Sequence, residues 1–425
     1  MKMDEYFLHY LWNNNLFNSE YLNFNGDKVE ILDTGTQNLS SGPDFFNAKI
    51  RLNNTIWAGN VEIHVKASDW FRHGHQKDPA YDNIILHVVY EDDIAVFRKN
   101  GEEIPFVRLS YNPGLWEKYM KLIHKGKVRE CVKYIHDIDR IYIRDWLGKL
   151  MVMRLEKKSK QPQALLKENN YDWEETLYKM LAQGFGMKLN AQPFFHLAES
   201  VPLKFVLKNR ENPSTLNAAF FGQAGFLDEI ISDDQYYSGL QREYMSIRDL
   251  LPSPFLRRHL WKTMRSRPSG FPLVRIPQFI QFVKTSFPLF ERVIREEKIK
   301  NLENLLYNGI KTYWVDHFLY GKSGRRKKYL PGKETIQRII INSFITVRFL
   351  YGSWKKNEIL KGSSLELLDN LMPENNEIIK KWDKFGITAE NAFDSQALIE
   401  LETQFCRGRK CLDCMIGIQV LKTKR

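Results

Sequence analysis

Four side chains that can bind a metal ion or carry a proton lie close together in two stretches that we expect to be neighbouring strands. Asp44 follows a Gly-Pro turn at the start of the first stretch, and Glu62, His64 and Lys66 alternate along the second. Side chains two residues apart in a strand share a face, so these three point one way and the apolar residues between them point the other way. If the strands pair as a hairpin, Asp44 comes close to Glu62 or His64.

The chemistry expected of this group is metal-assisted hydrolysis. Two carboxylates a few ångströms apart repel each other, and a cation between them relieves the repulsion. For Asp44 and Glu62 we expect Mg²⁺ or Mn²⁺, which would polarise a phosphate and lower the pKa of a bound water. The pattern therefore predicts a phosphodiesterase site. The alternative is an ordinary hairpin with polar residues on its solvated face.

The polar segment after the second strand supplies further candidate ligands. It contains His73, His75 and Asp78. With His64 and His87 these histidines would form a transition-metal site, because imidazole binds Zn, Mn or Fe. They would equally suit contacts with a phosphate beside the acids, and turn formation alone also explains the segment. We predict a supporting role for His73, His75 and Asp78 at the same cleft.

The cysteines form a second candidate site. Cys406, Cys411 and Cys414 make a C-x4-C-x2-C run near the C-terminus, and Cys131 is the remaining cysteine. A tetrahedral zinc ion or a four-cysteine iron–sulfur cluster needs a fourth thiolate, which Cys131 would supply. The spacing thus predicts a Zn or Fe–S site that ties the end of the chain to the region of Cys131. The alternative is a group of reduced thiols without metal.

The composition is that of a folded, basic protein. Of its 425 residues, 43% are hydrophobic and 13% aromatic, which excludes disorder of the whole chain. The net charge of +12 suits a polyanion such as nucleic acid or an acidic membrane surface, although a generic basic protein would share it. No stretch approaches ~18 apolar residues and no signal-peptide core is present. We therefore predict nucleic acid as the partner, no membrane span and a cytoplasmic location; the oligomeric state is not indicated.

Two halves with different periodicity divide the chain. A helix is expected over 4–17, and β-branched and aromatic runs predict strands over 28–35, 45–53, 59–68, 83–92, 94–101 and 103–110. Helical periodicity then predicts helices over 113–128, 138–158, 172–186, 192–208, 235–250, 254–267, 277–300, 302–320, 333–351, 363–383 and 388–405. The expected fold is α+β, with a mixed-sheet α/β domain over residues 1–112 and a larger all-α domain over 113–425 that ends in the cysteine run.

Prolines and glycines interrupt the helical pattern over 266–277 and 321–333, and the two interruptions lie in basic stretches over 261–279 and 321–333. The first interleaves arginine with aromatic residues, which suits phosphate and base contacts, and the second would follow a phosphate backbone. The alternatives are a loop packed on the core and a solvated turn. The residues predicted to bind nucleic acid are Lys262, Arg265, Arg267, Arg275, Arg325, Arg326, Lys327 and Lys328.

The order Pro-Asp, then seventeen residues, then Glu-Ile-His, on a frame of a helix and strands, resembles the PD-(D/E)XK nuclease superfamily over residues 1–110. The resemblance implies a nuclease-like fold, Mg²⁺-dependent hydrolysis of DNA or RNA, Asp44 and Glu62 as metal ligands, and Glu5 as a supporting glutamate on the helix. His64 stands where the family has lysine, so His64 or Lys66 would order the water or the leaving phosphate. Some exonucleases of this group also hold a [4Fe–4S] cluster with one remote cysteine and three C-terminal ones.

Segments spread over nearly the whole chain resemble a bacterial family of domains of unknown function, number 2851. They include GPDFFNAKI, WAGNVEIHVKASDW, NIILHVVY, FFGQAGFL and CLDCMIG. This resemblance implies a shared architecture and no particular activity. The sequence therefore predicts a Mg²⁺-dependent nuclease-like protein that acts on nucleic acid. The alternative, which the replacement at His64 favours, is an inactive nucleic-acid-binding or scaffold protein with the same fold.

Overall fold

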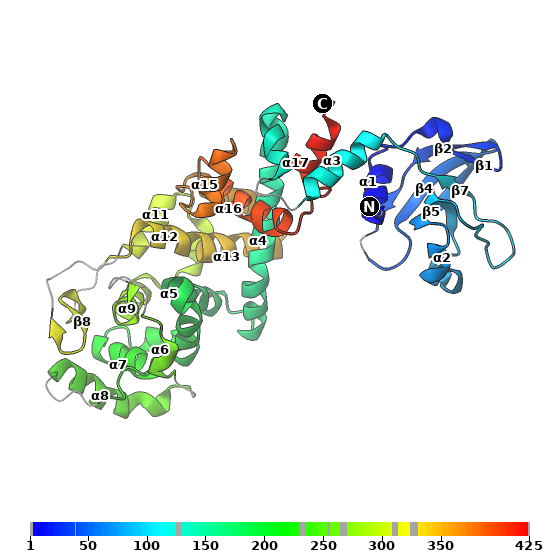
Figure 1. Cartoon of the computed structure of the whole chain (residues 1–425). Helices are drawn as coiled ribbons and strands as arrows, with labels where there is room; N and C mark the ends of the chain where they lie inside the picture. The colour runs from blue at the N-terminus through cyan, green and yellow to red at the C-terminus, as the bar shows by residue number, and fades with distance from the viewer. Residues whose placement is uncertain are drawn as a thin grey trace. The chain divides into compact units, whose positions relative to one another are not determined.

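The computed structural model describes residues 3–38, 40–124, 129–229, 234–252, 256–263, 270–307, 313–323 and 330–423. The chain forms two compact units, one made of residues 1–143 and 404–425 and the other of residues 144–403 (Figure 1). The C-terminal segment belongs with the N-terminal sheet because its helix packs against the helices that follow the sheet. The sequence had instead predicted a boundary at residue 112 and a helical domain that runs to the end of the chain.

The first unit is built on one sheet of seven strands, and its mixed pairing confirms the predicted mixed sheet. Its elements are α1 (Glu5–Asn13), η1 (Ser19–Tyr21), β1 (Asn23–Phe24), β2 (Asp27–Asp33), β3 (Thr36–Gln37), β4 (Phe45–Leu52), β5 (Thr55–Lys66), α2 (Asp69–Arg72), η2 (His75–Lys77), η3 (Pro79–Tyr81), β6 (Ile84–Glu91), β7 (Phe106–Arg108), α3 (Pro113–Ile123), η4 (Glu130–Asp137) and α17 (Met415–Lys422). The strand order is β1-β2-β4-β5-β6-β7, with β3 also on β4. Neighbours up to β5 are antiparallel, whereas β5 and β6, and β6 and β7, are parallel.

The β4–β5 hairpin closes on a two-residue turn. Asn53 and Asn54 both have positive φ, at 51° and 63°, and Leu52 pairs with Thr55 across them. Two left-handed central residues make a type I′ turn, whose twist matches that of the strands, and asparagine adopts this conformation more readily than most residues. The turn therefore sets the register of the two strands that carry the predicted acids.

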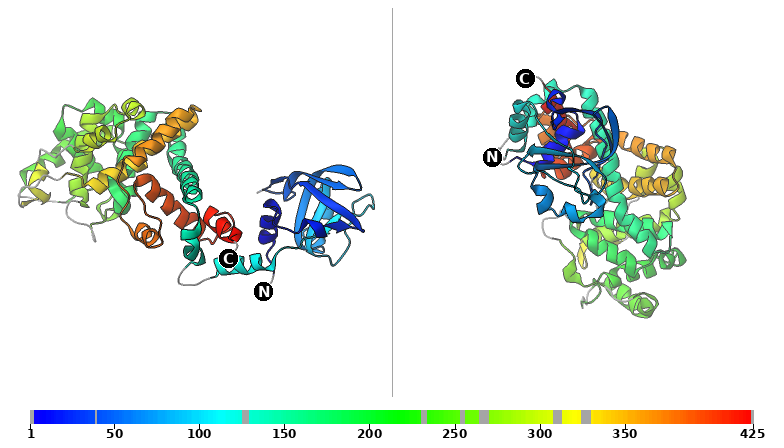
Figure 2. Two further views of the ribbon diagram at one scale, coloured as in Figure 1. Left: turned by 90° about the horizontal axis from the view of Figure 1, so that it is seen from above. Right: turned by 90° about the vertical axis from the view of Figure 1, so that its right-hand side faces the viewer.

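The connection from β5 to β6 covers one face of the sheet. Parallel neighbours need a crossover of a dozen or more residues, and here residues 67–83 form it with α2, η2 and η3. Helix α1 also packs on β5, as both Figure 1 and the left view of Figure 2 show. Between these coverings Glu62 and His64 are only 4% and 1% exposed.

The segment expected to be a strand over 94–101 is not one. It forms a single bridge, between Phe97 and Glu103, and Ile94 and Phe97 stay half-exposed. An apolar run needs a neighbouring strand to pair with, and β7, reduced to Phe106–Arg108, pairs with β6 instead. The expected strand over 103–110 is correspondingly shorter.

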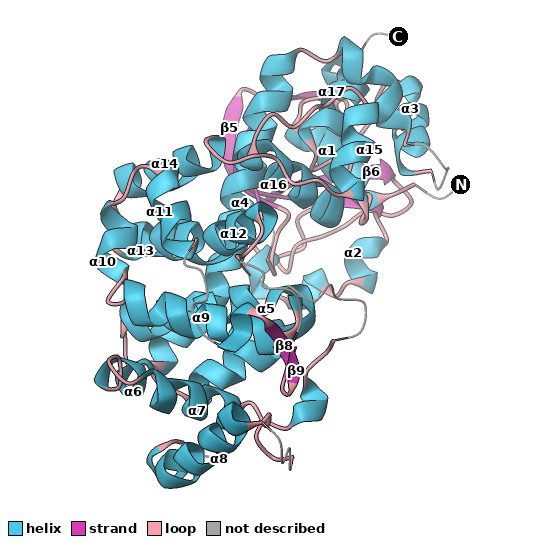
Figure 3. Cartoon of the chain, turned by 90° about the vertical axis from the view of Figure 1, so that its left-hand side faces the viewer, coloured by secondary structure: helices cyan, strands magenta, loops and turns pink. Residues whose placement is uncertain are grey.

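The second unit is mostly helical (Figure 3), whereas the sequence predicted an all-α domain. Its elements, with α4 and η10 containing the unit boundaries, are α4 (Arg140–Glu168), α5 (Trp173–Ser200), α6 (Leu203–Lys208), α7 (Pro213–Gln223), α8 (Gln235–Ile247), η5 (Arg248–Leu250), η6 (Arg258–Leu260), α9 (Pro272–Ser286), α10 (Phe290–Arg295), α11 (Ile299–Leu306), η8 (Tyr313–Val315), β8 (His317–Leu319), β9 (Lys322–Ser323), α12 (Lys333–Ile339), η9 (Ile340–Ile345), α13 (Thr346–Trp354), α14 (Glu358–Asp369), α15 (Glu377–Lys384), α16 (Ala392–Glu400) and η10 (Leu401–Cys406). The short β8–β9 ribbon replaces the end of a helix expected over 302–320. Within the described residues, no helix is long and apolar enough to cross a membrane.

The predicted break between two helices near residue 187 is a kink inside α5. Met187 has φ 53° and ψ −156°, and Asn190 has φ −120°. The Asn190 side chain is held by the backbone of Lys262, from which it accepts and to which it donates a hydrogen bond of 2.8 and 2.9 Å. A non-glycine residue with positive φ is strained, so the surrounding packing must hold Met187 in place.

Close packing of α7 on α8 yields a stability prediction. A Cβ on the buried Gly222 would lie 2.2 Å from a ring carbon of Tyr244. We expect Gly222→Ala to lower the free energy of unfolding by about 1–3 kcal/mol, because overpacking displaces neighbours. Urea denaturation followed by circular dichroism measures the change.

The control for this substitution is Gly239 in α8. A Cβ there would meet no atom within 4 Å. Gly239→Ala should raise the free energy of unfolding by about 0.5–1 kcal/mol, since alanine is the better helix former. Equal effects of the two substitutions would contradict the packing described.

Candidate functional site

The two predicted acids are joined across β4 and β5. Phe45 pairs with Val61, which places Asp44 and Glu62 beside the same rung of the hairpin. The Asp44 N–H donates to Glu62 Oε2 at 3.1 Å, and the Ile63 N–H donates to Asp44 Oδ2 at 2.9 Å. Each acid is thus fixed by the backbone next to the other, and the structure brings together the pair that the sequence singled out.

An irregularity in β4 lies beside this pair. The β4–β5 register shifts between Phe45 and Ala48, and Asn47 between them has φ 59°. Such a bulge inserts an extra residue and turns the strand, and bulges are common next to active sites because they redirect side chains. The expected hairpin is therefore present, with a bulge that the alternation of residue types did not indicate.

Glu62 is surrounded by imidazoles. Its Oε1 lies 3.1 Å from His75 Nε2 and 3.6 Å from His64 Nε2. Burial raises the pKa of the Glu62 carboxyl, and the contact with His75 opposes that rise. A cation among these atoms would hold the carboxylate ionised.

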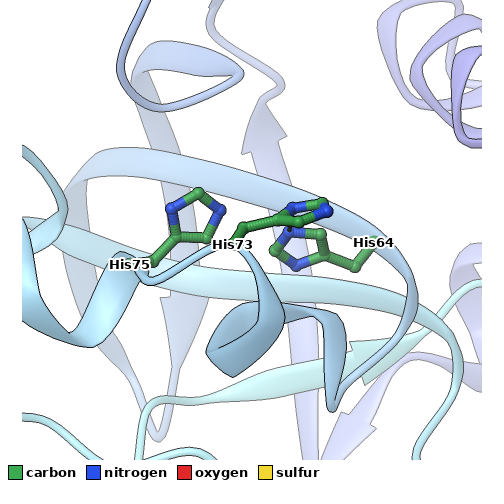
Figure 4. A group of neighbouring side chains, drawn as sticks. All are labelled: His64, His73 and His75. Carbon is green, nitrogen blue, oxygen red and sulfur yellow. Dashed lines mark hydrogen bonds between the residues drawn. The ribbon is translucent and has the colours of Figure 1, made fainter.

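Three histidines of the first unit meet at one point (Figure 4). His64 comes from β5, and His73 and His75 from the crossover after α2. One ring nitrogen from each lies within 4.8 Å of the other two, and His64 Nε2 is 3.1 Å from His73 Nδ1. Burial and then the neighbouring histidines lower the pKa of His64 to about 2, so its ring is neutral, the form that binds metal ions.

His87 orients the ring of His64 from behind. His87 Nε2 lies 2.8 Å from His64 Nδ1 in the interior of the unit. Burial lowers the pKa of His87 to about 3, so both rings are neutral and only one of the two nitrogens carries the shared proton. With that proton on His64 Nδ1, the Nε2 lone pair of His64 faces His73 and Glu62. A ligand histidine held through its other nitrogen is the usual arrangement around protein-bound metals.

His75 is placed by aromatic packing. Its ring stacks on Tyr81 with centroids 3.9 Å apart and meets Trp70 edge-on. Both aromatic residues are part of a buried cluster beneath the crossover. The Nε2 of His75 is buried, and its contact with Glu62 lacks hydrogen-bond geometry. The nitrogen is thus available to a ligand other than the carboxylate.

His9 is a site residue that the sequence reading missed. Its Nε2 lies 3.1 Å from Asp44 Oδ2. Burial opposes protonation of His9, but the contact with Asp44 and the charges of Glu5 and Glu62 raise its pKa. The predicted Glu5 lies one helical turn earlier, close enough for His9 and Asp44 to act on its pKa, which burial raises. The spacing of four residues on one helix face was the signal that could have identified His9.

Two predicted residues lie apart from the acids. The Lys66 side chain is half-exposed, and its Nζ pairs with Glu91 at 2.8 Å. Asp78 accepts the Ala80 N–H at 2.9 Å and so caps the short helix η3. In the part of the chain that the structure describes, neither side chain contacts Asp44 or Glu62. Lys66 therefore does not supply the ammonium group expected at the acidic pair.

The predicted nucleic-acid-binding residues divide into three groups. The prediction for Arg275 is wrong. The residue is 7% exposed, and its guanidinium binds Gln278 and Thr335 inside the second unit at 3.3 Å each. It therefore cannot contact a nucleic acid. Lys262 is exposed beside Asn190. The others lie outside the described residues: Arg265, Arg267, Arg325, Arg326, Lys327 and Lys328.

The four cysteines line one small cavity of the first unit. Cys131 comes from η4, and Cys406, Cys411 and Cys414 come from the C-terminal segment, so the predicted grouping is present. Burial and the neighbouring Cys414 raise the pKa of Cys131 to about 12 and that of Cys411 to about 11. Without a cation these two groups are thiols, and a metal would be needed to stabilise their thiolates.

Comparison with known proteins gives one match. The model of a family described as "Protein of unknown function (DUF2851)" matches residues 5–377. No curated protein and no solved structure matches the chain. The matched span contains the acids, the histidines and Cys131, and it ends before the three C-terminal cysteines.

The histidine group predicts metal binding that can be measured directly. We expect the protein, stripped of metal with a chelator, to bind one Mn²⁺ or Zn²⁺ more tightly than Mg²⁺, because imidazole prefers the softer ions. His73→Ala should weaken this binding by about tenfold or more, since even residues that only support metal ligands contribute that much. Isothermal titration calorimetry gives both affinities.

The matched control is His136→Ala, which removes an exposed histidine of η4 in the same unit. Its affinity should equal that of the unaltered protein. Equal affinities for all three proteins would mean that the metal binds elsewhere.

Proposed function

The chain belongs to the DUF2851 family, and on that premise we propose that its first unit is a metal-dependent phosphodiesterase that cleaves nucleic acid. The observation that carries the proposal is the joined pair of Asp44 and Glu62, with the imidazoles of His64 and His75 against Glu62 and that of His73 beside His64. Carboxylates beside neutral histidines are a donor set for a catalytic divalent ion.

The identity of the ion follows from the donors. The sequence predicted Mg²⁺ or Mn²⁺, and Mg²⁺ prefers ligands that are oxygen atoms. Here His64, His73 and His75 offer nitrogen, and the buried Nε2 of His75 lacks a hydrogen-bond partner within the described residues. The residues fit Mn²⁺, Zn²⁺ or Fe²⁺ better than Mg²⁺, with Glu62 as the carboxylate ligand.

Each side chain then has a distinct part in the reaction. When bound, the ion would polarise the phosphate and lower the pKa of a water. Asp44, held by the Ile63 N–H, lies beside His9. The contact with Asp44 favours the protonated form of the His9 imidazole, and that proton can pass to the leaving oxygen. His64 stays neutral and orders the attacking water or binds the ion.

The arrangement also supports the PD-(D/E)XK interpretation of the first unit. A helix that packs on antiparallel strands, followed by a crossover to a parallel strand, is what the resemblance implies. Glu5, Asp44 and Glu62 lie around one site, and His64 occupies the position of the lysine. The net charge of +12 supports a polyanionic substrate. An inactive nucleic-acid-binding protein remains the second candidate, because the lysine is replaced.

Cleavage assays decide between the two candidates. We expect the purified protein with Mn²⁺ to cut single- or double-stranded DNA or RNA. Glu62→Gln should lower the rate by about 100-fold or more, because it removes a metal-holding charge from the reacting centre. Gel electrophoresis of end-labelled strands measures the rate.

Glu30→Gln is the matched control. It makes the same substitution at an exposed glutamate that pairs with Arg51 on the same sheet, and it should leave the rate unchanged. Binding of the strands without cleavage, with Mn²⁺, Zn²⁺, Fe²⁺ and Mg²⁺ alike, would establish the inactive protein instead.

We further propose that the four cysteines hold a metal centre, and that an iron–sulfur cluster fits better than one zinc ion. Sulfurs around tetrahedral zinc lie about 3.8 Å apart, as Zn–S bonds of ~2.3 Å require. Although the four line one cavity, no three of these described sulfurs fall within 4.8 Å of one another. Arg129, Arg409 and Lys410 also line the cavity and would offset the charge of four thiolates.

Anaerobic purification followed by metal analysis tests this centre. We expect about four Fe per chain, and their loss in Cys131→Ser. Gly417→Ala should also lower the iron content, since its Cβ would lie 2.1 Å from the Cys411 carbonyl oxygen and displace that cysteine. Gly408→Ala is the control, because its nearest contact would be an ordinary 3.6 Å. Folded protein that never contains metal would eliminate the centre.

A further inference from the structure

The second unit contains a cavity of about 500 Å³ with a strongly cationic lining. Its wall comes from α4, α5, η9 and the ends of α12 and α16. The charged lining residues are five cations and one carboxylate: Arg154, Lys157, Lys158, Lys188, Arg338 and Glu400. The volume is within the ~300–1,000 Å³ of small-molecule sites. Such an excess of cations around one hollow favours an anionic ligand.

Only some of these cations form ion pairs within the described part of the unit. Arg154 binds Glu400 at 2.8 Å and Gln396 at 2.7 Å, and Lys157 lies 3.7 Å from the same Glu400. Glu400 is 2% exposed, so its charge requires these partners. Arg154 and Glu400 therefore form a structural pair at the base of the cavity.

The hydrogen-bond partners of Lys158 within the described residues are neutral. Its Nζ donates to Asn342 Oδ1 at 2.6 Å and to Gln396 Oε1 at 3.1 Å. Burial and then the charge of Arg154 lower the pKa of Lys158 to about 7. An anion beside this nitrogen would stabilise its ammonium form.

Two more cations are available to a ligand. Arg338 is half-buried and Lys188 is exposed, and the described part of the chain provides neither with an ion pair. A guanidinium binds two oxygens of a phosphate at once, whereas an ammonium acts as a mobile point charge. The two side chains thus suit a phosphate group at the mouth of the cavity.

The helices around the cavity are closely packed and have an irregular backbone. Ser343 donates from its Oγ to the Met180 carbonyl at 3.1 Å, and a Cβ on Gly184 would lie 3.3 Å from that Oγ, so α5 and η9 are in close contact. η9 is π-helical and carries Asn342, while the strained Met187 lies on the facing wall. π-helical turns and strained residues are enriched at functional sites.

The uncharged lining indicates the organic part of the ligand. Gln161, Gln183 and Asn342 offer amide donors and acceptors, and Met180, Met187 and Ala191 offer apolar surface. Amides read the edges of nucleobases, and methionine packs adaptably on flat groups. We propose that this cavity binds a nucleotide, with Lys158, Lys188 and Arg338 on its phosphates. The nucleotide is either free or the phosphorylated end of a strand.

Calorimetric titration of the full chain with ADP, in EDTA to prevent cleavage, tests the proposal. We expect one ADP per chain, and Arg338→Gln and Lys188→Gln should each weaken binding by about tenfold, because each removes a charge-assisted hydrogen bond. Arg292→Gln and Lys300→Gln are matched controls at exposed positions of the same unit that do not line the cavity, and their affinity should be unchanged.

Competition distinguishes the two sources of the nucleotide. A short oligonucleotide with a 5′-phosphate should displace ADP if the ligand is a strand end, and its 5′-hydroxyl counterpart should not. Failure of both oligonucleotides assigns the cavity to free nucleotides. The proposal is overturned if ADP does not bind, if inorganic phosphate binds as well as ADP, or if both substitutions leave binding intact. Because Glu62→Gln should not alter ADP binding, the phosphodiesterase proposal can fail separately.

Discussion

Burial of the Glu62 carboxylate is the constraint on which the first unit depends. An ionised carboxylate at 4% exposure costs several kcal/mol unless charges or hydrogen bonds replace its hydration. The Asp44 N–H and the imidazoles of His64 and His75 surround it. Each of these groups comes from a different part of the unit: the segment just before β4, β5 itself and the β5–β6 crossover. The parallel pairing of β5 and β6 requires a crossover, and this crossover places the segment that carries His73 and His75 over Glu62.

The sequence contained much of this site. Alternation along 59–68 correctly separated Glu62 and His64 from the apolar positions, and the expected pairing of 45–53 with 59–68 correctly brought Asp44 close to Glu62. Lys66 shows that alternation alone does not predict which side chains reach the site. It shares their face by parity, but β5 emerges from beneath the crossover at its last residue, so Lys66 turns to Glu91 at the surface. His9 was missed because its contact with Asp44 spans 35 positions, and only its spacing of four residues from Glu5 connected it to the site.

The second unit shows the same contrast. Helical periodicity identified most helices, and the break near residue 187 was anticipated as a chain interruption. The part that this kink plays in the cavity could not be predicted, because the cavity forms only where α5 comes together with η9 and α4. The cavity there combines residues from 154 to 400. No spacing rule connects positions so distant in the sequence, and the buried Arg275 likewise could not be told from an exposed arginine.

The first unit is discontinuous in the chain, since it consists of residues 1–143 and residues 404–425. During synthesis, the whole second unit must leave the ribosome before the last three cysteines can join Cys131. The sheet can form early from neighbouring strands. Helix α17 packs against α3 and η4, and this contact closes a loop that contains the entire helical unit. A chain that stops before residue 404 would therefore contain the acids and the histidines but lack three of the four cysteines.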